Sequence, residues 1–476
     1  MNIKNDVASI VGSKYVSDDP EVLAKYSKDH SFVTPRKPSV VAYPENKEEI
    51  QQLVQFAYEH SIPLTPRSSS ISFYGAGIPS QGGVVVDFIR MNKILEFHAG
   101  DRKVRIEPGV TWQQVETELE KKGMMVSSSL LPPKNKSALT SAMQREPILS
   151  AKYEYSDTFQ TAEMVLGNGQ VYYTGTAIAP ANVGRSHPEL FIPSNKLFMG
   201  AQGTLGFVTW ATLKAEWIPP KDKVYFIASD SVDQIVDPIY KTQRVYLGNE
   251  CFALNNVTLA SILAGSAEEF SRLKEVLPPW VVILNLASGH AFPEDKIAYE
   301  EEALMKIAQE RHFKVSETIA GAPGLERNLI SLLRKPYQGD EYWKFQFKGS
   351  AQQIFFITTL DKAGEFTKAM ETVAAKHGYP VKDIGMYIQP IERARAVSCE
   401  YNFAFNPNDP KEVARVRAMF LEASQLVIAM GGLFTNPYGP WADLVYSKAG
   451  HYASIMKVVK NVFDPKNIMN PGKLCF

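Results

Sequence analysis

Short β-branched runs alternate with amphipathic stretches through the first part of the chain. After Asn46, which suits a helix N-cap, apolar side chains recur at three- and four-residue spacing until Pro63 interrupts them. The buried stripe predicted for this helix comprises Ile50, Leu53, Val54 and Ala57. A second helix is predicted from Thr111, where Gln114 completes a capping box and Gly123 suits the left-handed residue after the last turn.

Strand signals lie before, between and after these two helices. Residues 39–43 are rich in β-branched side chains, and residues 84–86 form the continuous valine run typical of a fully buried strand. Two further apolar runs, 164–166 and 170–173, flank Gly167-Asn168-Gly169, which is a strong β-hairpin signal. Because β-α-β units and hairpins occur together, the pattern predicts an α+β fold.

The pattern changes around Trp217-Ile218-Pro219-Pro220-Lys221, where we place a boundary. Longer helices follow, including one over residues 411–430 that Gly431-Gly432 terminates. A last helix is predicted over residues 447–462, and Asp464-Pro465 stops it before an extended tail.

Composition excludes several classes of protein. The chain has 476 residues, enough for two or three domains, and its 51 Lys+Arg balance its 51 Asp+Glu, which argues against nucleic-acid binding. Cys251, Cys399 and Cys475 form no CxxC pair, so a zinc ribbon, a disulfide scaffold and a cysteine-ligated iron–sulfur cluster are all disfavoured. No apolar stretch is long enough to span a membrane, and we expect a soluble, cytoplasmic protein.

Three motifs, in order along nearly the whole chain, carry a family resemblance. The first begins at Pro66-Arg67 and extends to residues 91–94; the second, residues 197–209, contains Gly203-Thr204-Leu205-Gly206; the third, residues 463–473, ends in Asn470-Pro471-Gly472-Lys473. Together they resemble the FAD-linked oxidases of the vanillyl-alcohol oxidase and p-cresol methylhydroxylase type. Flavin-linked D-lactate dehydrogenases and the flavin subunit of glycolate oxidase are also members of that family.

The resemblance implies a two-part FAD-binding domain with a cap. Residues 1–218 would form the N-terminal part of the FAD-binding domain, and residues 219–431 a cap that holds substrate, built on an antiparallel sheet with helices. Residues 432–476 would return to the FAD-binding domain. This arrangement agrees with the boundary that the change of pattern indicates.

FAD is the cofactor that the resemblance implies. In the family, the backbone of the turn that matches Gly203–Gly206 lies beside the adenine and ribose of FAD. The alternative for this chain is a plain tight turn that packs between two strands. The residues expected to contact FAD are Arg67, Ser68, Ser69, Ser70, Ile71, Ser72, Gly75, Gly203, Thr204, Gly206, Val208, Asn470 and Lys473.

Two departures from the family pattern concern the phosphate loops. Serines replace three expected glycines after Arg67, and Ala76 replaces a fourth, so the backbone loses easy access to positive φ although serine hydroxyls can donate to phosphate. A second flavin loop normally contains glycine, yet residues 124–166 contain none. Arg145 in this segment can pair with a phosphate; alternatively the segment is a helix that fills a vacant flavin channel.

The polar stretch from Tyr387 to Asn402 is the richest candidate for chemistry in the cap. Arg393 or Arg395 is expected to bind a carboxylate or phenolate of the substrate, whereas the simpler interpretation is an ion pair between these arginines and Glu392 or Glu400. Alternation places Glu400 on one face of a strand, and Tyr438 follows in an aromatic loop. We assign Arg393, Glu400 and Tyr438 as catalytic candidates. The later histidines lack ligand spacing, so no metal site is expected.

Two functions remain open from the sequence. The first is an FAD-dependent dehydrogenase that moves a hydride from an alcohol, 2-hydroxy acid or alkylphenol to flavin and passes electrons to a partner, such as an iron–sulfur subunit. The second is a flavin-free paralogue that acts as a scaffold beside a catalytic flavoprotein subunit. Both interpretations favour an oligomer.

Overall fold

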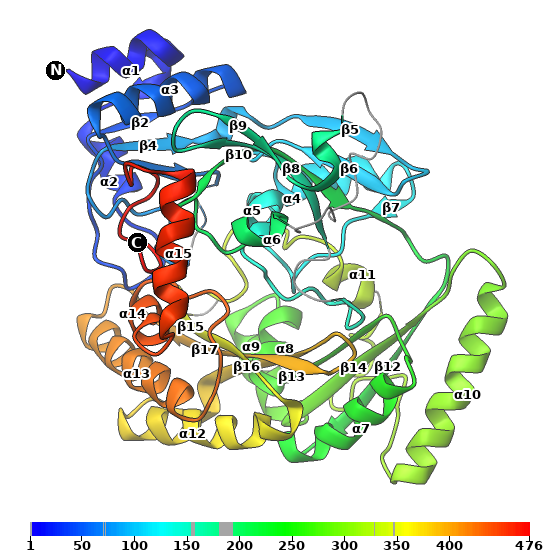
Figure 1. Cartoon of the computed structure of the whole chain (residues 1–476). Coiled ribbons are helices and arrows are strands. Elements are labelled where there is room, and N and C mark those ends of the chain that lie inside the picture. Colours follow the sequence, from blue (N-terminus) through cyan, green and yellow to red (C-terminus); the bar gives the residue numbers. More distant parts are fainter. Residues whose placement is uncertain are drawn as a thin grey trace.

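The computed structural model describes residues 2–69, 71, 73–153, 158–179, 194–327, 329–345 and 348–476. Two halves lie one above the other in Figure 1, with smaller sheets in the upper half and one large sheet in the lower half. The last helix, α15 (His451–Phe463), brings the chain from the lower half back to the upper half.

A small sheet near the N-terminus begins the upper half. Its strand order is β1-β2-β4-β3, in which β2, β4 and β3 run parallel and β1 antiparallel. Helices α1 and α3 pack on it, and α3 begins after Asn46, whose side chain accepts from the Glu49 amide, as predicted. The bounds are β1 (Val16–Ser17), β2 (Val40–Ala42), β3 (Leu64–Arg67), β4 (Val84–Asp87), α1 (Ile3–Val11), α2 (Pro20–Tyr26) and α3 (Lys47–His60).

A second, antiparallel sheet has the order β5-β6-β10-β8-β9. The predicted hairpin is present as β8 paired with β9, and α4 begins at the predicted Thr111–Gln114 capping box. A separate two-residue pair joins β11 to β7. The bounds are β5 (Ile94–His98), β6 (Lys103–Ile106), β7 (Met124–Met125), β8 (Phe159–Leu166), β9 (Val171–Tyr173), β10 (Gly206–Lys214), β11 (Glu216–Trp217), α4 (Trp112–Glu120), α5 (Ala138–Met143) and α6 (Asn195–Phe198).

The lower half is a six-stranded antiparallel sheet of order β12-β14-β13-β16-β17-β15. Side chains of α7, α12 and α13 share a core with one face of this sheet, and those of α8, α9 and α11 share a core with other sheet residues. The bounds are β12 (Asp222–Ser229), β13 (Glu250–Asn255), β14 (Trp280–Ala287), β15 (Ser350–Thr358), β16 (Ile384–Ile391), β17 (Ala396–Phe405), α7 (Val232–Arg244), α8 (Asn256–Leu263), α9 (Ala267–Val276), α10 (Pro293–Arg311), α11 (Leu329–Leu333), α12 (Ala363–Lys376) and α13 (Pro410–Ala429).

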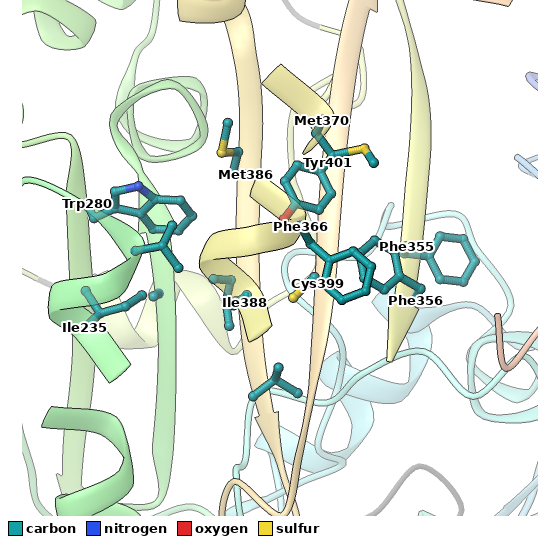
Figure 2. Close-up of a cluster of buried hydrophobic side chains, with 14 of the residues drawn as sticks. Ile235, Trp280, Phe355, Phe356, Phe366, Met370, Met386, Ile388, Cys399 and Tyr401 are labelled. Atoms are coloured by element: carbon teal, nitrogen blue, oxygen red, sulfur yellow. The ribbon is translucent and has the colours of Figure 1, made fainter. Parts of the chain in front are cut away.

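The main core of the lower half lies between the sheet and these helices (Figure 2). The ring of Phe366 in α12 is tilted against that of Phe356 in β15, with centroids 4.7 Å apart, and Tyr401 of β17 shares a 3.0 Å hydroxyl hydrogen bond with Thr367. Each such buried side chain contributes roughly 1.5–3 kcal/mol. Since side chains alternate along a strand, Glu400 faces away from this core, on a platform that the core makes rigid.

The C-terminal region differs from its prediction at one helix boundary. The predicted helix over 447–462 begins only at His451, because Gly450 has φ 54 and separates α15 from an unpredicted helix, α14 (Pro440–Tyr446). The tail then lies along β3, where the Leu64 amide donates to Ile468 O at 2.8 Å and the Asn470 amide to Leu64 O at 2.7 Å. The end of the chain therefore packs against the first sheet.

No helix in the described part of the chain is long and apolar enough to cross a bilayer.

Candidate active site

A cavity lies in the upper half, and we call it the loop cavity. It encloses about 950 Å³ of empty space, open solvent included, between the loop after β3, helix α5 and the turn before β10. The carboxyl ends of parallel strands β3 and β4 meet at one edge of their sheet, so the loop after β3 leaves from that edge. Its lining includes Arg67, Ser68, Ser69, Ile71, Gly77, Leu139, Thr140, Met143, Gln144, Gly203, Gly206, Val208 and Tyr438.

One wall of the loop cavity is polar and only partly satisfied. The Nε and Nη1 atoms of Arg67 are buried and have no hydrogen-bond partner among the described residues, while the guanidinium lies 4.8 Å from the Tyr26 ring centroid. Ser68 is hydrogen-bonded to Thr140 of α5 on the facing wall. These groups leave unused donor capacity toward an anionic ligand.

The turn before β10 requires glycine for steric reasons. Gly203 has φ 71, and a Cβ there would lie 2.3 Å from Pro66 Cγ. Gly206 approaches β8 so closely that a Cβ would lie 2.8 Å from Val165 O. The side chain of Thr204 donates to Ala201 O at 2.7 Å, and Thr204 is not part of the cavity lining, whereas Gly203, Leu205 and Gly206 are.

The C-terminal tail supports the loop after β3 from behind. Lys473 Nζ donates to Gly75 O at 2.9 Å, and Asn470 Nδ2 donates to Ala76 O at 3.0 Å and to Gln202 O at 2.6 Å. Burial lowers the pKa of the Lys473 ammonium to about 8, although Asp29 acts in the opposite direction. The contacts of Asn470 and Lys473 therefore hold the loop in place from outside the cavity. Neither residue is part of the cavity lining, and nor is Gly75.

A second cavity, the cap chamber, lies beside the first and faces the large sheet. Two ion pairs line it: Lys136 with Glu146, and Lys344 with Glu400. Glu146 also accepts from the Ser129 hydroxyl at 2.9 Å, and Glu400 from Asn402 Nδ2 at 2.8 Å. The exposed side-chain fractions are 3% for Lys136, 15% for Glu146, 7% for Lys344 and 13% for Glu400. Both carboxylates are thus charged groups held in a largely dry site.

Aromatic rings form the other walls of the cap chamber. The Tyr74 ring stacks on Tyr438, which borders the loop cavity, with ring centroids 4.6 Å apart. Burial raises the pKa of the Tyr74 and Tyr342 hydroxyls, and the carboxylates of Glu146 and Glu400 add to the effect. Both phenols are therefore neutral at physiological pH and can donate a hydrogen bond.

Gln144 lies where the two cavities meet and lines both of them. Its Oε1 atom is buried without a hydrogen-bond partner among the described residues, as are Asn436 Oδ1 and the Tyr438 hydroxyl. Asn436 Nδ2 donates to Gln144 O and so fixes the backbone at the junction. A group that occupies this junction would meet two free acceptors and one hydroxyl.

The structure brings most of the predicted cofactor residues to the loop cavity. Arg67, Ser68, Ser69, Ile71, Gly203, Gly206 and Val208 line it, as does Tyr438, whereas Glu400 lines the cap chamber. Ser70 and Ser72 lie outside the described residues.

The substrate-binding expectation for Arg393 does not fit its position. Its Nη1 donates to Gln243 Oε1 at 3.2 Å and to Gly248 O at 2.8 Å, and Arg393 lines neither cavity. Three successive residues with positive φ, 392–394, form the turn between β16 and β17 and carry the arginine to the far end of the sheet. The alternative of an ion pair is confirmed for Arg395, whose Nη1 lies 3.0 Å from Glu392 Oε1, whereas Glu400 pairs with Lys344.

Sequence reasoning missed several residues at the site. Gln144 and Glu146 lie in the glycine-free segment, for which the sequence indicated only Arg145. Arg145 borders the cap chamber and donates to Lys196 O at 3.2 Å. Lys136 and Lys344 had no local signal, because each becomes notable only through a carboxylate that the fold brings beside it. No group of three or more His, Cys, Asp or Glu in the described ranges could hold a metal ion.

The loop cavity fits an elongated anionic cofactor such as FAD. Unpartnered Arg67 nitrogens and the Ser68 and Thr140 hydroxyls can meet phosphates. Free acceptors at Gln144 and Asn436 suit the N–H and hydroxyl donors of a flavin with its ribityl chain.

Comparisons with known proteins agree with this fit. Residues 38–175 match the model of the FAD binding domain, and residues 358–474 match that of the C-terminal domain of FAD linked oxidases. Among curated proteins, the Bacillus subtilis glycolate oxidase subunit GlcD is 24% identical, covering 99% of this chain and 96% of its own length. The probable mitochondrial D-lactate dehydrogenase of Danio rerio is also 24% identical, covering 98% and 90%.

Solved structures confirm the predicted fold class. Substrate-bound p-cresol methylhydroxylase superposes with a TM-score of 0.81 at 18% identity, over 100% of this chain and 96% of that one. The 4-ethylphenol oxidase of Gulosibacter chungangensis superposes with a TM-score of 0.83 at 18% identity, over 99% and 96%. The chain belongs to the FAD-linked oxidase family of the vanillyl-alcohol oxidase and p-cresol methylhydroxylase type, a family of enzymes whose cofactor is FAD.

Proposed function

We propose that this chain is an FAD-dependent dehydrogenase that oxidises a neutral alcohol or alkylphenol in the cap chamber, in preference to a 2-hydroxy acid. The observation that carries the proposal is the charge state of the chamber. Each lysine that lines it, Lys136 and Lys344, is already neutralised by a carboxylate. The remaining cation of the lining, Arg145, donates to Lys196 O, so an anionic substrate would add a third negative charge to a site with no free lysine to pair with it.

The walls of the chamber support a substrate with a planar apolar part. Rings of Tyr74, Tyr342 and Phe355 offer flat apolar surface, and the two phenols are neutral donors. The likeness to p-cresol methylhydroxylase and to 4-ethylphenol oxidase favours a phenolic substrate, whereas glycolate oxidase and D-lactate dehydrogenase are named for hydroxy acids.

In the proposed roles, Glu400 accepts the proton of the substrate hydroxyl. Lys344 and Asn402 hold its carboxylate in place through direct contacts. Gln144 and Tyr438 stand at the junction and orient the reacting carbon toward the loop cavity. Arg67, Ser68 and Thr140 would hold the phosphates of FAD, which when bound supplies the two-electron acceptor.

Electrons would then leave for a separate partner. The three cysteines of the chain are not spaced as iron–sulfur ligands, so a further redox centre would have to come from another subunit. An iron–sulfur subunit or a second flavoprotein of the same fold is the partner we propose, in a hetero-oligomer.

Anaerobic reduction of the bound flavin tests the proposal. Aromatic alcohols and alkylphenols should bleach the flavin absorbance near its visible maximum, faster than D-lactate or glycolate. Glu400→Gln should slow bleaching by about 10²–10⁴-fold, the usual contribution of a general base. The matched control is Glu422→Gln, whose carboxylate pairs with Lys376 on the surface of α13 and should leave the rate unchanged. Equal bleaching by all variants would remove Glu400 from the mechanism.

One observation favours a second candidate, a flavin-free scaffold. Ser68 and Thr140 of the cavity lining are hydrogen-bonded to each other, and Leu139 and Met143 add apolar side chains to the same lining. A chain of this kind would bind a flavoprotein of the same fold and carry no cofactor. Purified protein that remains colourless after incubation with FAD would support the scaffold and exclude the dehydrogenase.

A further inference from the structure

Two hydroxyl groups meet across the loop cavity, one from each of its facing walls. Ser68 directly follows the end of β3, and Thr140 lies in the first turns of α5. Their side chains are hydrogen-bonded to each other, and both residues line the cavity. No other hydrogen bond of the described residues joins the Ser68 side chain to the α5 wall.

The position of Thr140 is fixed by the cap of its helix. Ser137 is fully buried; its hydroxyl accepts from the Thr140 amide at 3.0 Å and donates to Pro108 O at 2.6 Å. Trp112 Nε1 donates to Ser141 Oγ at 3.0 Å and holds the next residue of the helix. Thr140 therefore presents its hydroxyl from a rigid wall.

The described residues of the facing loop do not form a concave site of backbone amides. Such a site requires residues that alternate between right- and left-handed conformations. None of the described residues from Ser68 to Tyr74 has a positive φ, and the first to do so is Gly75, whose amide is already occupied by Asp29 Oδ2 at 2.7 Å. Within the described part of this loop, the groups placed to donate to a phosphate are therefore side chains.

We propose that Ser68 and Thr140 form a hydroxyl clamp for the pyrophosphate of FAD. Their mutual hydrogen bond pairs the two hydroxyls, and on binding each hydroxyl turns to donate to a phosphate oxygen beside the Arg67 guanidinium. The clamp replaces the contacts to phosphate that backbone amides would make in a glycine-rich loop. It depends on the proposed function only because it takes FAD as the ligand.

Quenching of flavin fluorescence measures the affinity of the apoprotein for FAD and, in parallel, for riboflavin, which lacks phosphate. Ser68→Ala and Thr140→Val should each weaken FAD binding about ten- to a hundredfold, the range for a lost hydrogen bond to a charged group. Riboflavin binding should not change. Thr140→Ser keeps the hydroxyl and should bind FAD as the parent chain does. Ser271→Ala, on the exposed surface of α9, is the matched control.

Undiminished FAD affinity in Ser68→Ala and Thr140→Val would overturn the clamp, as would tighter binding, since the hydroxyls would then only obstruct the cavity. Equal loss of FAD and riboflavin binding would also overturn it, because the contact would not be to phosphate. A parent chain that binds neither FAD nor ADP rules the clamp out directly. The proposed function fails separately, when FAD binds through the clamp and no alcohol or alkylphenol reduces it.

Discussion

Removing one partner of the Lys344–Glu400 pair tests whether the cap chamber is as dry as its geometry indicates. The side chains are 7% and 13% exposed, so Lys344→Met would leave the Glu400 carboxylate nearly buried, with Asn402 as its remaining donor. Breaking a buried ion pair in this way costs about 3–5 kcal/mol. The variant should therefore lose that much free energy of unfolding.

The double variant Lys344→Met/Glu400→Gln should recover most of the loss. Two neutral groups of similar volume replace the pair, so its stability should lie within about 2 kcal/mol of the parent chain. Urea unfolding of the four proteins in a double-mutant cycle measures the coupling free energy.

The exposed pair Lys376–Glu422 provides the control. Its side chains are 65% and 35% exposed, and the same cycle there should give a coupling below about 1 kcal/mol. If Lys344→Met costs no more than Lys376→Met, water reaches the chamber, and the argument that its charges exclude an anionic substrate is refuted.

Three further predictions concern the support of the site. Gly203→Ala should lower the free energy of unfolding by about 1–3 kcal/mol more than Gly123→Ala, and thermal melts compare the two. Both glycines have positive φ, but only a Cβ at position 203 would clash, because it would lie 2.3 Å from Pro66 Cγ. The pKa of Lys473 in the folded chain is about 8, below its usual value of 10.5. Between these two pH values the unfolded chain binds more protons than the folded chain, so the free energy of unfolding should rise with pH. Urea unfolding at pH 7.5 and 9.5 measures the rise, which Lys473→Met should abolish. Tyr438→Phe removes a buried hydroxyl that has no partner among the described residues, so the apoprotein should be no less stable, whereas a weaker affinity for FAD would assign the hydroxyl to the cofactor.

The sequence predicted those parts of the fold that local patterns determine. Helix α3 followed from the Asn46 cap and its apolar stripe, and the β8–β9 hairpin from its central glycines, because such signals need only neighbours in the chain. The boundary before α15 was wrong, since a glycine with positive φ at position 450 interrupts an otherwise helical pattern.

The site was predictable where motifs specify backbone geometry and not where distant side chains pair. Gly203 and Gly206 were found through their motif, and the structure gives the physical reason for the motif, since their turn tolerates no Cβ. The two ion pairs of the cap chamber join Lys136 to Glu146 and Lys344 to Glu400, and the second spans 56 positions of sequence. Arg393 was chosen for its charge alone, which does not reveal that backbone carbonyls and Gln243 already bind it.

The central claim is that the loop cavity holds FAD, and the visible spectrum of the purified chain, with the flavin then released by acid and quantified, tests it most directly. We expect a yellow protein, either as isolated or after incubation with FAD, that releases about one FAD per chain. A folded chain that remains colourless after such incubation would contradict the claim and would direct the search to a flavin-bearing partner of the same fold.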